Sequence, residues 1–223
     1  MRGGLVPLLL GAAIAAEASD ALLPSNAAEA GEGYVYIVRH GEKSHWWACL
    51  NTTGMARAVA FPSIFDGNPR PSGERFYTPR ALVAYFYGDD YHDGHKDCER
   101  CVETLMPISQ TLGLPIQQVA KTTAHMANDA ASLIMRLIGE QASSSATGPP
   151  VVLVAWNHHQ IDALTEALRV APGQLPSWPD TDFGMVFQLV VRPHAFTASD
   201  NRNVLASLTV SSEEWHPSSE TER

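Results

Sequence analysis

Two arginines and a pair of histidines are the residues of this chain that could do chemistry. Arg39 and His40 directly follow residues 34–38, whose β-branched and aromatic side chains predict a buried strand. Gly41 then permits the chain to turn. Open α/β sheets bind their ligands beyond the carboxyl ends of their strands. We therefore expect Arg39 and His40 to lie at a ligand site.

The second arginine, Arg100, lies near the start of a predicted helix. Apolar residues recur there at helical spacing, with Asp97 as the expected cap and Gly113 as the end. Arg100 would occupy the first turn, where the helix dipole favours an anion. Arg80 is the rival candidate, but it precedes a strand predicted over residues 81–87.

Both histidines of the pair follow another buried strand. Residues 151–156 are apolar, and His158 and His159 come next, before a helix predicted to begin near Ile161. The remaining expected elements are a helix over residues 124–138, a surface link over residues 141–150, and strands over residues 185–192 and 204–210. All of the candidate residues therefore lie at strand ends or at a helix start.

These segments resemble the histidine phosphatase superfamily, also called the phosphoglycerate mutase-like fold, whose hallmark is Arg-His-Gly after the first strand. The helix of Arg100 fits the family pattern Arg-x-x-x-Thr-x-x-Pro-(Ile/Leu)-(Ala/Ser)-x-x-Leu-Gly through Arg100, Thr104, Pro107, Ile108, Ser109, Leu112 and Gly113. Residues 50–58 are similar to the family's Leu-Thr-x-x-Gly-x-x-x-Ala segment, with Thr52 or Thr53 as the cap of the next helix. The resemblance spans roughly residues 33–210.

The resemblance implies an α/β fold, a three-layer αβα sandwich with a mostly parallel central sheet. It also implies a phosphomonoester hydrolase, most active on the acid side, that needs no metal or cofactor. His40 would attack phosphorus and form a phosphohistidine, while Arg39 and Arg100 hold the phosphate oxygens. His158, if protonated, would stabilise the transition state, with His159 as the alternate for this role. The family usually has Ser at position 157 and Gly at position 159, where this chain has Asn and His.

The proton donor for the leaving group is not evident. The family usually supplies a Glu or Asp after the second arginine's helix or directly after the second histidine. Residues 121–128 contain no acid, and residue 159 is a histidine. His159, Asp162 and Glu42 are the substitutes that we consider. The missing acid motivates a rival interpretation, a non-catalytic module of the same fold that binds a phosphate ester. A mutase is a further and less expected alternative.

A zinc site is the sharpest alternative of another class. His92, His95, Cys98 and Cys101 are each three residues apart, and two histidines with two cysteines suit zinc. A helix from residue 97 would keep the two cysteines from converging with the histidines, and secretory oxidation would consume thiols. Cys49 could instead form a disulfide with Cys98 or Cys101. We expect Cys101 to be a buried helix residue.

The expected organisation is one exported domain. Residues 1–18 are typical of a secretory signal peptide, 19–32 of a flexible terminus, 33–210 of the domain and 211–223 of a frayed polar tail. Asn51 begins a glycosylation sequon, Asn-Thr-Thr, which is consistent with a secreted or lumenal glycoprotein without a stable membrane anchor.

Composition limits the partners. The chain has 223 residues, of which 45% are hydrophobic and 17% charged, as in an ordinary globular protein. The formal net charge of −9 argues against a nucleic-acid partner but leaves room for one phosphate ester beside an arginine pair. Trp46, Trp47 and Trp156 could line its pocket or belong to the core. The sequence does not indicate the oligomeric state.

Overall fold

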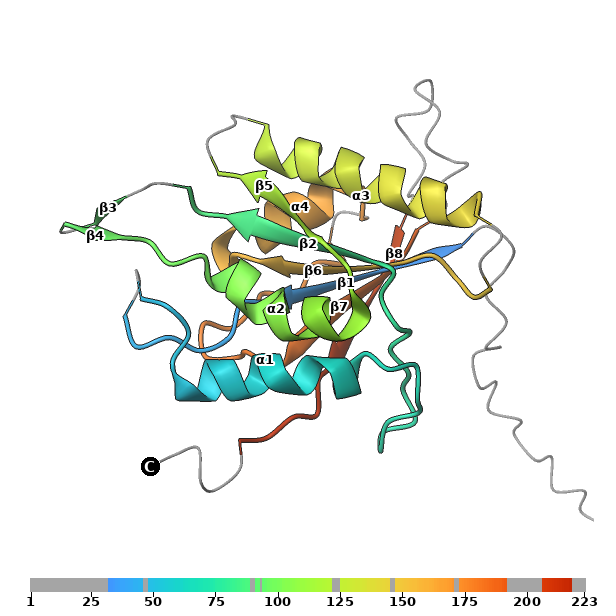
Figure 1. Ribbon diagram of the computed structural model, residues 1–223. Helices are drawn as coiled ribbons and strands as arrows, with labels where there is room; N and C mark the ends of the chain where they lie inside the picture. The colour runs from blue at the N-terminus through green and yellow to red at the C-terminus, as the bar shows by residue number, and fades with distance from the viewer. Residues whose placement is uncertain are drawn as a thin grey trace, which may run out of the picture.

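A six-stranded sheet between two layers of helices forms the protein (Figure 1). The computed structural model describes residues 32–45, 48–88, 91–92, 94–121, 125–144, 147–170, 173–191 and 206–217. The strands are β1 (Gly33–Arg39), β2 (Ala81–Phe86), β5 (Ile116–Ala120), β6 (Val151–Trp156), β7 (Met185–Val191) and β8 (Ala206–Ser212), and β3 (Tyr91–His92) pairs with β4 (His95–Lys96) in a separate hairpin. The helices are α1 (Thr52–Ile64), α2 (Arg100–Leu112), α3 (Met126–Ala142) and α4 (Ile161–Ala167), with a short 3₁₀ turn η1 (His158–Gln160).

The sheet is mostly parallel, as the resemblance implied. Its strand order is β5-β2-β6-β1-β7-β8, and only β7 runs against its neighbours. Helices α1 and α2 cover one face, and α3 and α4 cover the other (Figure 1). Because β5, β2, β6 and β1 are parallel, their carboxyl ends meet at one edge of the sheet. This edge receives Arg39 from β1 and the histidine pair from β6.

The core explains why β1 and β6 were predictable. Residues 35–38 of β1 and all of β6 are buried, so both strands have apolar side chains on both faces. Helix α2 buries the expected face and ends at Gly113, whose φ of 65° lies in the left-handed region. Trp156 is fully buried, so it belongs to the core and does not line a pocket.

Several local predictions were wrong. Asn51 caps α1 in place of Thr52 or Thr53, because its side chain accepts a hydrogen bond from the Gly54 amide at 2.9 Å. Glu99 occupies the N-cap position of α2, so Asp97 does not cap that helix. Helix α3 continues past residue 138 to Ala142. Strand β5 was missed because two glutamines interrupt its apolar pattern at the edge of the sheet.

The end of the domain also differs from the expectation. Strand β8 reaches Ser212, and Glu213 is fully buried, so residues 211–213 belong to the fold and are not frayed.

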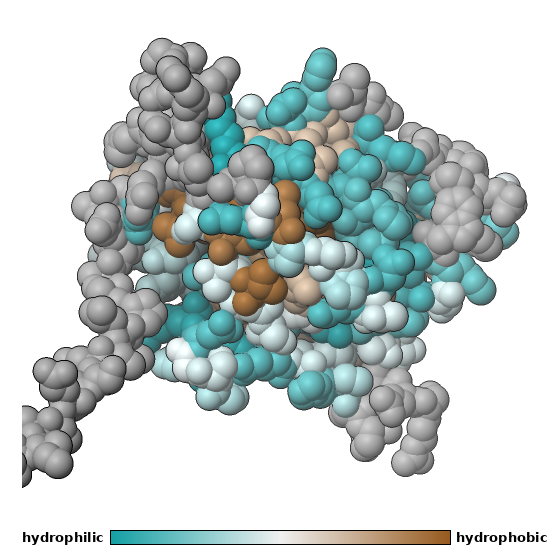
Figure 2. All heavy atoms as spheres, turned by 180° about the vertical axis from the view of Figure 1, so that it is seen from behind, coloured by the Kyte–Doolittle hydropathy of each residue, from teal (hydrophilic) through white to brown (hydrophobic). Residues whose placement is uncertain are grey.

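The expected signal peptide, residues 1–18, and residues 19–31 of the flexible terminus lie outside the described part of the chain, as do Trp46 and Trp47. Within the described ranges, no helix is both long enough and apolar enough to cross a membrane. The face turned away in Figure 1 is mainly hydrophilic, with a small apolar group near its centre (Figure 2).

Candidate active site

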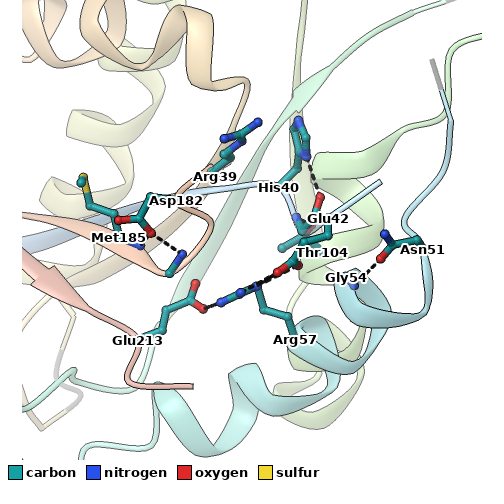
Figure 3. Close-up of polar contacts among 12 residues, drawn as sticks. Arg39, His40, Glu42, Asn51, Gly54, Arg57, Thr104, Asp182, Met185 and Glu213 are labelled. Atoms are coloured by element: carbon teal, nitrogen blue, oxygen red, sulfur yellow. Dashed lines mark hydrogen bonds and ion pairs between the residues drawn. The ribbon is translucent and has the colours of Figure 1, made fainter. Parts of the chain in front are cut away.

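Strand register brings the two candidate histidines together. Arg39 pairs with Trp156 across the parallel β1–β6 ladder, and the His40 amide donates to the Trp156 carbonyl at 3.3 Å. The chain then leaves β6 through Asn157 into η1, which places the His158 ring 6.4 Å from the His40 ring, centroid to centroid. Arg39 and His40 rise from the same strand end (Figure 3).

His40 is held as a neutral imidazole. Its Nδ1 lies 2.8 Å from the Gly41 carbonyl oxygen, which can only accept, so Nδ1 carries the proton and Nε2 has the free lone pair. Burial lowers the pKa of His40 to about 3, and the positive charges of Arg100, Arg39 and Lys43 contribute to the decrease, against the effect of the Gly41 carbonyl. An uncharged ring with a defined lone pair is the form that a nucleophile requires.

Arg39 is anchored by the segment before β7. Its guanidinium carbon lies 3.9 Å from the Phe183 ring centroid, and its Nη1 donates to the Asp180 carbonyl oxygen at 2.5 Å. Its buried Nε has no hydrogen-bond partner among the described residues. The guanidinium group is therefore fixed in orientation, while its Nε–H can still donate to a ligand.

Arg100 is fixed in a similar way from the other side of the pocket. Its Nη1 donates to the Ala48 carbonyl at 3.2 Å and lies 3.9 Å from Asp97 Oδ1, while its guanidinium carbon lies 4.2 Å from the Tyr87 ring centroid. Its Nε is buried and, within the described structure, lacks a hydrogen-bond partner. Two oriented guanidinium groups near His40 suit an oxyanion such as phosphate.

His158 contacts an acid that the sequence did not single out. Its Nε2 lies 3.2 Å from Asp180 Oδ1. Burial lowers the pKa of His158 to about 4, with Arg39 and His159 adding to the effect and Asp180 opposing it. His159 packs against it at 3.7 Å between ring centroids and is exposed.

One pocket collects most of these groups. Its volume is about 220 Å³, and it is lined by His40, Lys43, Tyr85, Tyr87, Asp97, Arg100, Lys121, Asn157, His158 and His159. Arg39 directly precedes His40, and it contacts Asp180, the residue that also contacts His158. Its positive charge lowers the pKa values of His40 and His158. The structure thus brings together Arg39, His40, Arg100, His158 and His159, the residues expected from the sequence.

A tight backbone contact fixes the loop that follows His40. A Cβ on Gly54 would lie 2.3 Å from the Glu42 carbonyl oxygen, and one on Gly41 would lie 2.9 Å from the Gly54 Cα, so neither position accepts a side chain. The Gly41 amide also donates to Thr104 Oγ1 at 2.9 Å, which ties the loop to α2. The Gly and Thr of the motifs are therefore packing requirements of the site.

An ion-pair chain supports the same loop from below. Arg57 of α1 lies 2.6 Å from Glu42 on one side and 2.6 Å from Glu213 on the other (Figure 3). Its guanidinium carbon also lies 4.5 Å from the Trp215 ring centroid. Burial alone would lower the pKa of Arg57, but the hydrogen bonds and charges of Glu42 and Glu213 raise it. Glu42 is thus a partner of Arg57 and does not line the pocket.

The rival arginine and the candidate proton donors occupy different parts of the fold. Arg80 precedes β2 at the opposite edge of the sheet and donates to Ser144 Oγ at 2.7 Å, so it is not a site residue. Asp162 is exposed on α4 and does not line the pocket, whereas His159 does. Asp97 and Asp180 are acids near the histidines that the sequence did not mark as site residues: Asp97 was predicted to be a helix cap, and no pattern marks Asp180.

The arrangement of the cysteines excludes the alternative zinc site. Cys49 is bonded to Cys98 with a Cα–Cα distance of 4.8 Å, and Cys101 is a fully buried free thiol of α2. A sulfur in a disulfide cannot serve as a thiolate ligand, so His92, His95, Cys98 and Cys101 do not form the zinc site of the alternative interpretation. The disulfide holds residues 48–50 against the start of α2, where Ala48 accepts from Arg100.

Loss of this disulfide should destabilise the fold. Chain-entropy arguments for a sequence separation of 49 residues give about 4 kcal/mol. We expect the Cys49→Ser, Cys98→Ser double variant to unfold at lower urea concentration than the wild type. Reductant should destabilise the wild type and leave the double variant unchanged. Equal urea midpoints for the oxidised wild type and the double variant would contradict a stabilising role.

Comparison with solved structures shows the fold. A mycobacterial glucosyl-3-phosphoglycerate phosphatase matches with a TM-score of 0.50 and 16% identity over 80% of this chain and 98% of its own, and its complex with inorganic phosphate scores 0.51 at 16% identity over 82% and 100%. A structure described as mycobacterial hydrolase 2 scores 0.52 at 17% identity over 85% and 94%. No family model and no curated protein sequence matches this chain. The chain therefore shares the fold of these solved structures, a mostly parallel sheet between two layers of helices, as the resemblance implied.

Proposed function

We propose that the protein hydrolyses phosphate monoesters through a phosphohistidine intermediate at His40. The observation that carries the proposal is the state of His40. Its buried imidazole is neutral, its Nδ1 donates a hydrogen bond to the Gly41 carbonyl oxygen, and the charges of Arg39 and Arg100 lie near it. A phosphoryl group in transfer requires positioning and positive charge more than covalent assistance. The two arginines supply both.

In the first step, the Nε2 lone pair of His40 would form a bond to phosphorus while the bond to the ester oxygen breaks. The leaving oxygen takes a proton, and water then cleaves the P–N bond to release phosphate and restore neutral His40. His158 would donate a hydrogen bond to a phosphoryl oxygen, because an incoming anion favours its protonated form. Asp97 and His159 are further acid–base groups in the lining of the pocket.

The pH dependence of kcat/KM provides the test. His40 stays neutral above about pH 3, and His158 in the free enzyme is neutral above about pH 4. A monoester dianion gains a proton near pH 6. If the reacting complex needs one proton on His158 or on the substrate, kcat/KM is highest between about pH 4 and 6 and falls above this range. His40 protonation would reduce it below about pH 3.

The measurement is hydrolysis of phenyl phosphate across this pH range with and without a chelator. We expect an acid-side plateau that the chelator leaves unchanged, because the arginines would supply the charge stabilisation. Activity that depends on a metal, or that rises above pH 7, would contradict the mechanism. Phosphate binding with no turnover would favour the non-catalytic binding module, which the unidentified proton donor motivates.

We also propose that the chain acts in the secretory lumen or outside the cell, as a glycoprotein. The disulfide between Cys49 and Cys98 supports this, because such bonds persist in oxidising compartments. The cap at Asn51 uses Oδ1 and leaves Nδ2, the atom that carries a glycan, outside the capping bond. A mass decrease of the secreted chain on glycosidase treatment tests the proposal; an unchanged mass would oppose glycosylation.

A further inference from the structure

The lysines of this chain are few, and they gather at the pocket. The sequence contains three lysines, Lys43, Lys96 and Lys121, and two of them line the pocket of His40. The chain as a whole carries a formal net charge of −9. The pocket lining, however, includes the cations Lys43, Lys121 and Arg100 and, as its one carboxylate among the described residues, Asp97. Arg39 directly precedes His40 of the same lining. The pocket is therefore positive in an acidic protein, which focuses anions on it.

Lys43 lies close to the groups that would hold the phosphate. It follows His40 by three residues, forms an isolated bridge with Leu50 and donates from Nζ to the His45 carbonyl at 3.2 Å. Burial lowers the pKa of Lys43, and the charges of Arg100 and Arg39 lower it further, while Asp97 opposes them. Its charge in turn lowers the pKa of His40. Lys43 thus lines the same pocket as His40 and Arg100, and its charge interacts with theirs and with that of Arg39.

Lys121 reaches the pocket from a different element. Its amide donates to the Phe86 carbonyl at 3.0 Å and so extends the β5–β2 pairing at the carboxyl edge of the sheet. Its side chain is exposed at the rim of the pocket. The family that the chain resembles usually has an acid in the loop that begins here, whereas residues 121–128 contain none and begin with a lysine. An ammonium group is a good ligand for an anion.

We propose that Lys43 and Lys121 form a subsite for a second anionic group, so that the substrate is a phosphomonoester that also carries a carboxylate or a second phosphate. This inference rests on the proposed function, since Arg39 and Arg100 would hold the reacting phosphoryl group. Two arginines already balance a phosphate dianion, protonated His158 would pair with Asp180, and Asp97 offsets one of the two lysine charges, so one positive charge remains. Lysine, a compact charge on a flexible stem, accepts anions of varied geometry, so the second group need not be planar.

Binding of two non-hydrolysable phosphonates tests the proposal. Methylphosphonate carries one anionic group, whereas phosphonoacetate adds a carboxylate. A charge-assisted contact contributes enough to predict at least about tenfold tighter binding of phosphonoacetate to the wild type by calorimetry. In the Lys43→Gln, Lys121→Gln double variant, this preference should disappear, with phosphonoacetate losing far more affinity than methylphosphonate. Lys96→Gln, which removes an exposed lysine outside the pocket, should keep the preference.

The outcomes separate this proposal from the one on which it rests. Equal affinity for both phosphonates in the wild type, or a preference that survives in the double variant, would overturn the subsite. A lysine-dependent preference in a protein that does not hydrolyse phenyl phosphate would support the subsite and overturn the hydrolase. A wild type that binds neither phosphonate would overturn both. A preference that also vanishes in Lys96→Gln would overturn the assignment to the pocket lysines.

Discussion

Replacement of His40 by alanine should lower kcat/KM for phenyl phosphate by at least about 10⁴-fold. The His40 ring lines the pocket, and the buried hydrogen bond from its Nδ1 to the Gly41 carbonyl leaves the Nε2 lone pair free to attack phosphorus. Its loss removes the bond-forming atom and forces any remaining hydrolysis to proceed by direct attack of water. The arginines alone can stabilise charge but cannot supply a covalent intermediate.

The control for this variant is His216→Ala, which removes an exposed histidine of the C-terminal segment and should retain wild-type activity. Calorimetry should show that His40→Ala still binds inorganic phosphate, because Arg39 and Arg100 remain. A variant without activity but with phosphate affinity isolates the nucleophile from the binding site. Retention of more than a tenth of the wild-type activity in His40→Ala would refute the role of His40.

Replacement of Arg57 by methionine should lower the free energy of unfolding by about 3–5 kcal/mol. Arg57 and Glu213 have side chains that are 7% and 0% exposed, so the variant leaves a carboxylate buried without its partner. Glu42 loses the same partner, and Glu42 lies two residues after His40. We therefore expect activity to fall as well, because the loop that holds the His40 backbone is less constrained.

Arg136→Met is the matched control, because it breaks an ion pair with Glu140 whose side chains are both 56% exposed. An exposed helical pair contributes only about 0.3–0.5 kcal/mol. Urea unfolding of the two variants should therefore differ several-fold in the loss of stability. If Arg57→Met loses no more than Arg136→Met, the buried chain from Glu42 to Glu213 is not a support of the fold.

The sequence was informative where local pattern and burial coincide. Strands β1 and β6 have continuous apolar runs, and the ends of these runs therefore predicted a site at Arg39, His40 and His158. The register of β1 against β6 brings these residues close together. Helix α2 was equally predictable, because its apolar spacing and Gly113 are signals internal to the helix.

The residues that hold the site residues in place are brought there by tertiary structure, and no local sequence pattern predicts them. Asp180 and Phe183 lie in an irregular segment, and they reach Arg39 and His158 only because β7 pairs antiparallel with β1. Arg57 and Glu213 are separated by 156 residues. Cys98, which precedes α2, is the partner of Cys49, whereas Cys101 lies on the buried face of α2, a distinction that cysteine counting does not make.

Trapping of the phosphorylated enzyme tests the central claim most directly. The purified protein would be mixed with phenyl phosphate, quenched in alkali within the first turnovers and digested for mass spectrometry, since a P–N bond on histidine survives alkali better than acid. The account predicts a phosphate on the peptide that contains His40 and none in His40→Ala. Turnover by the wild type with no phosphorylated His40, or with the phosphate on another residue, would contradict it.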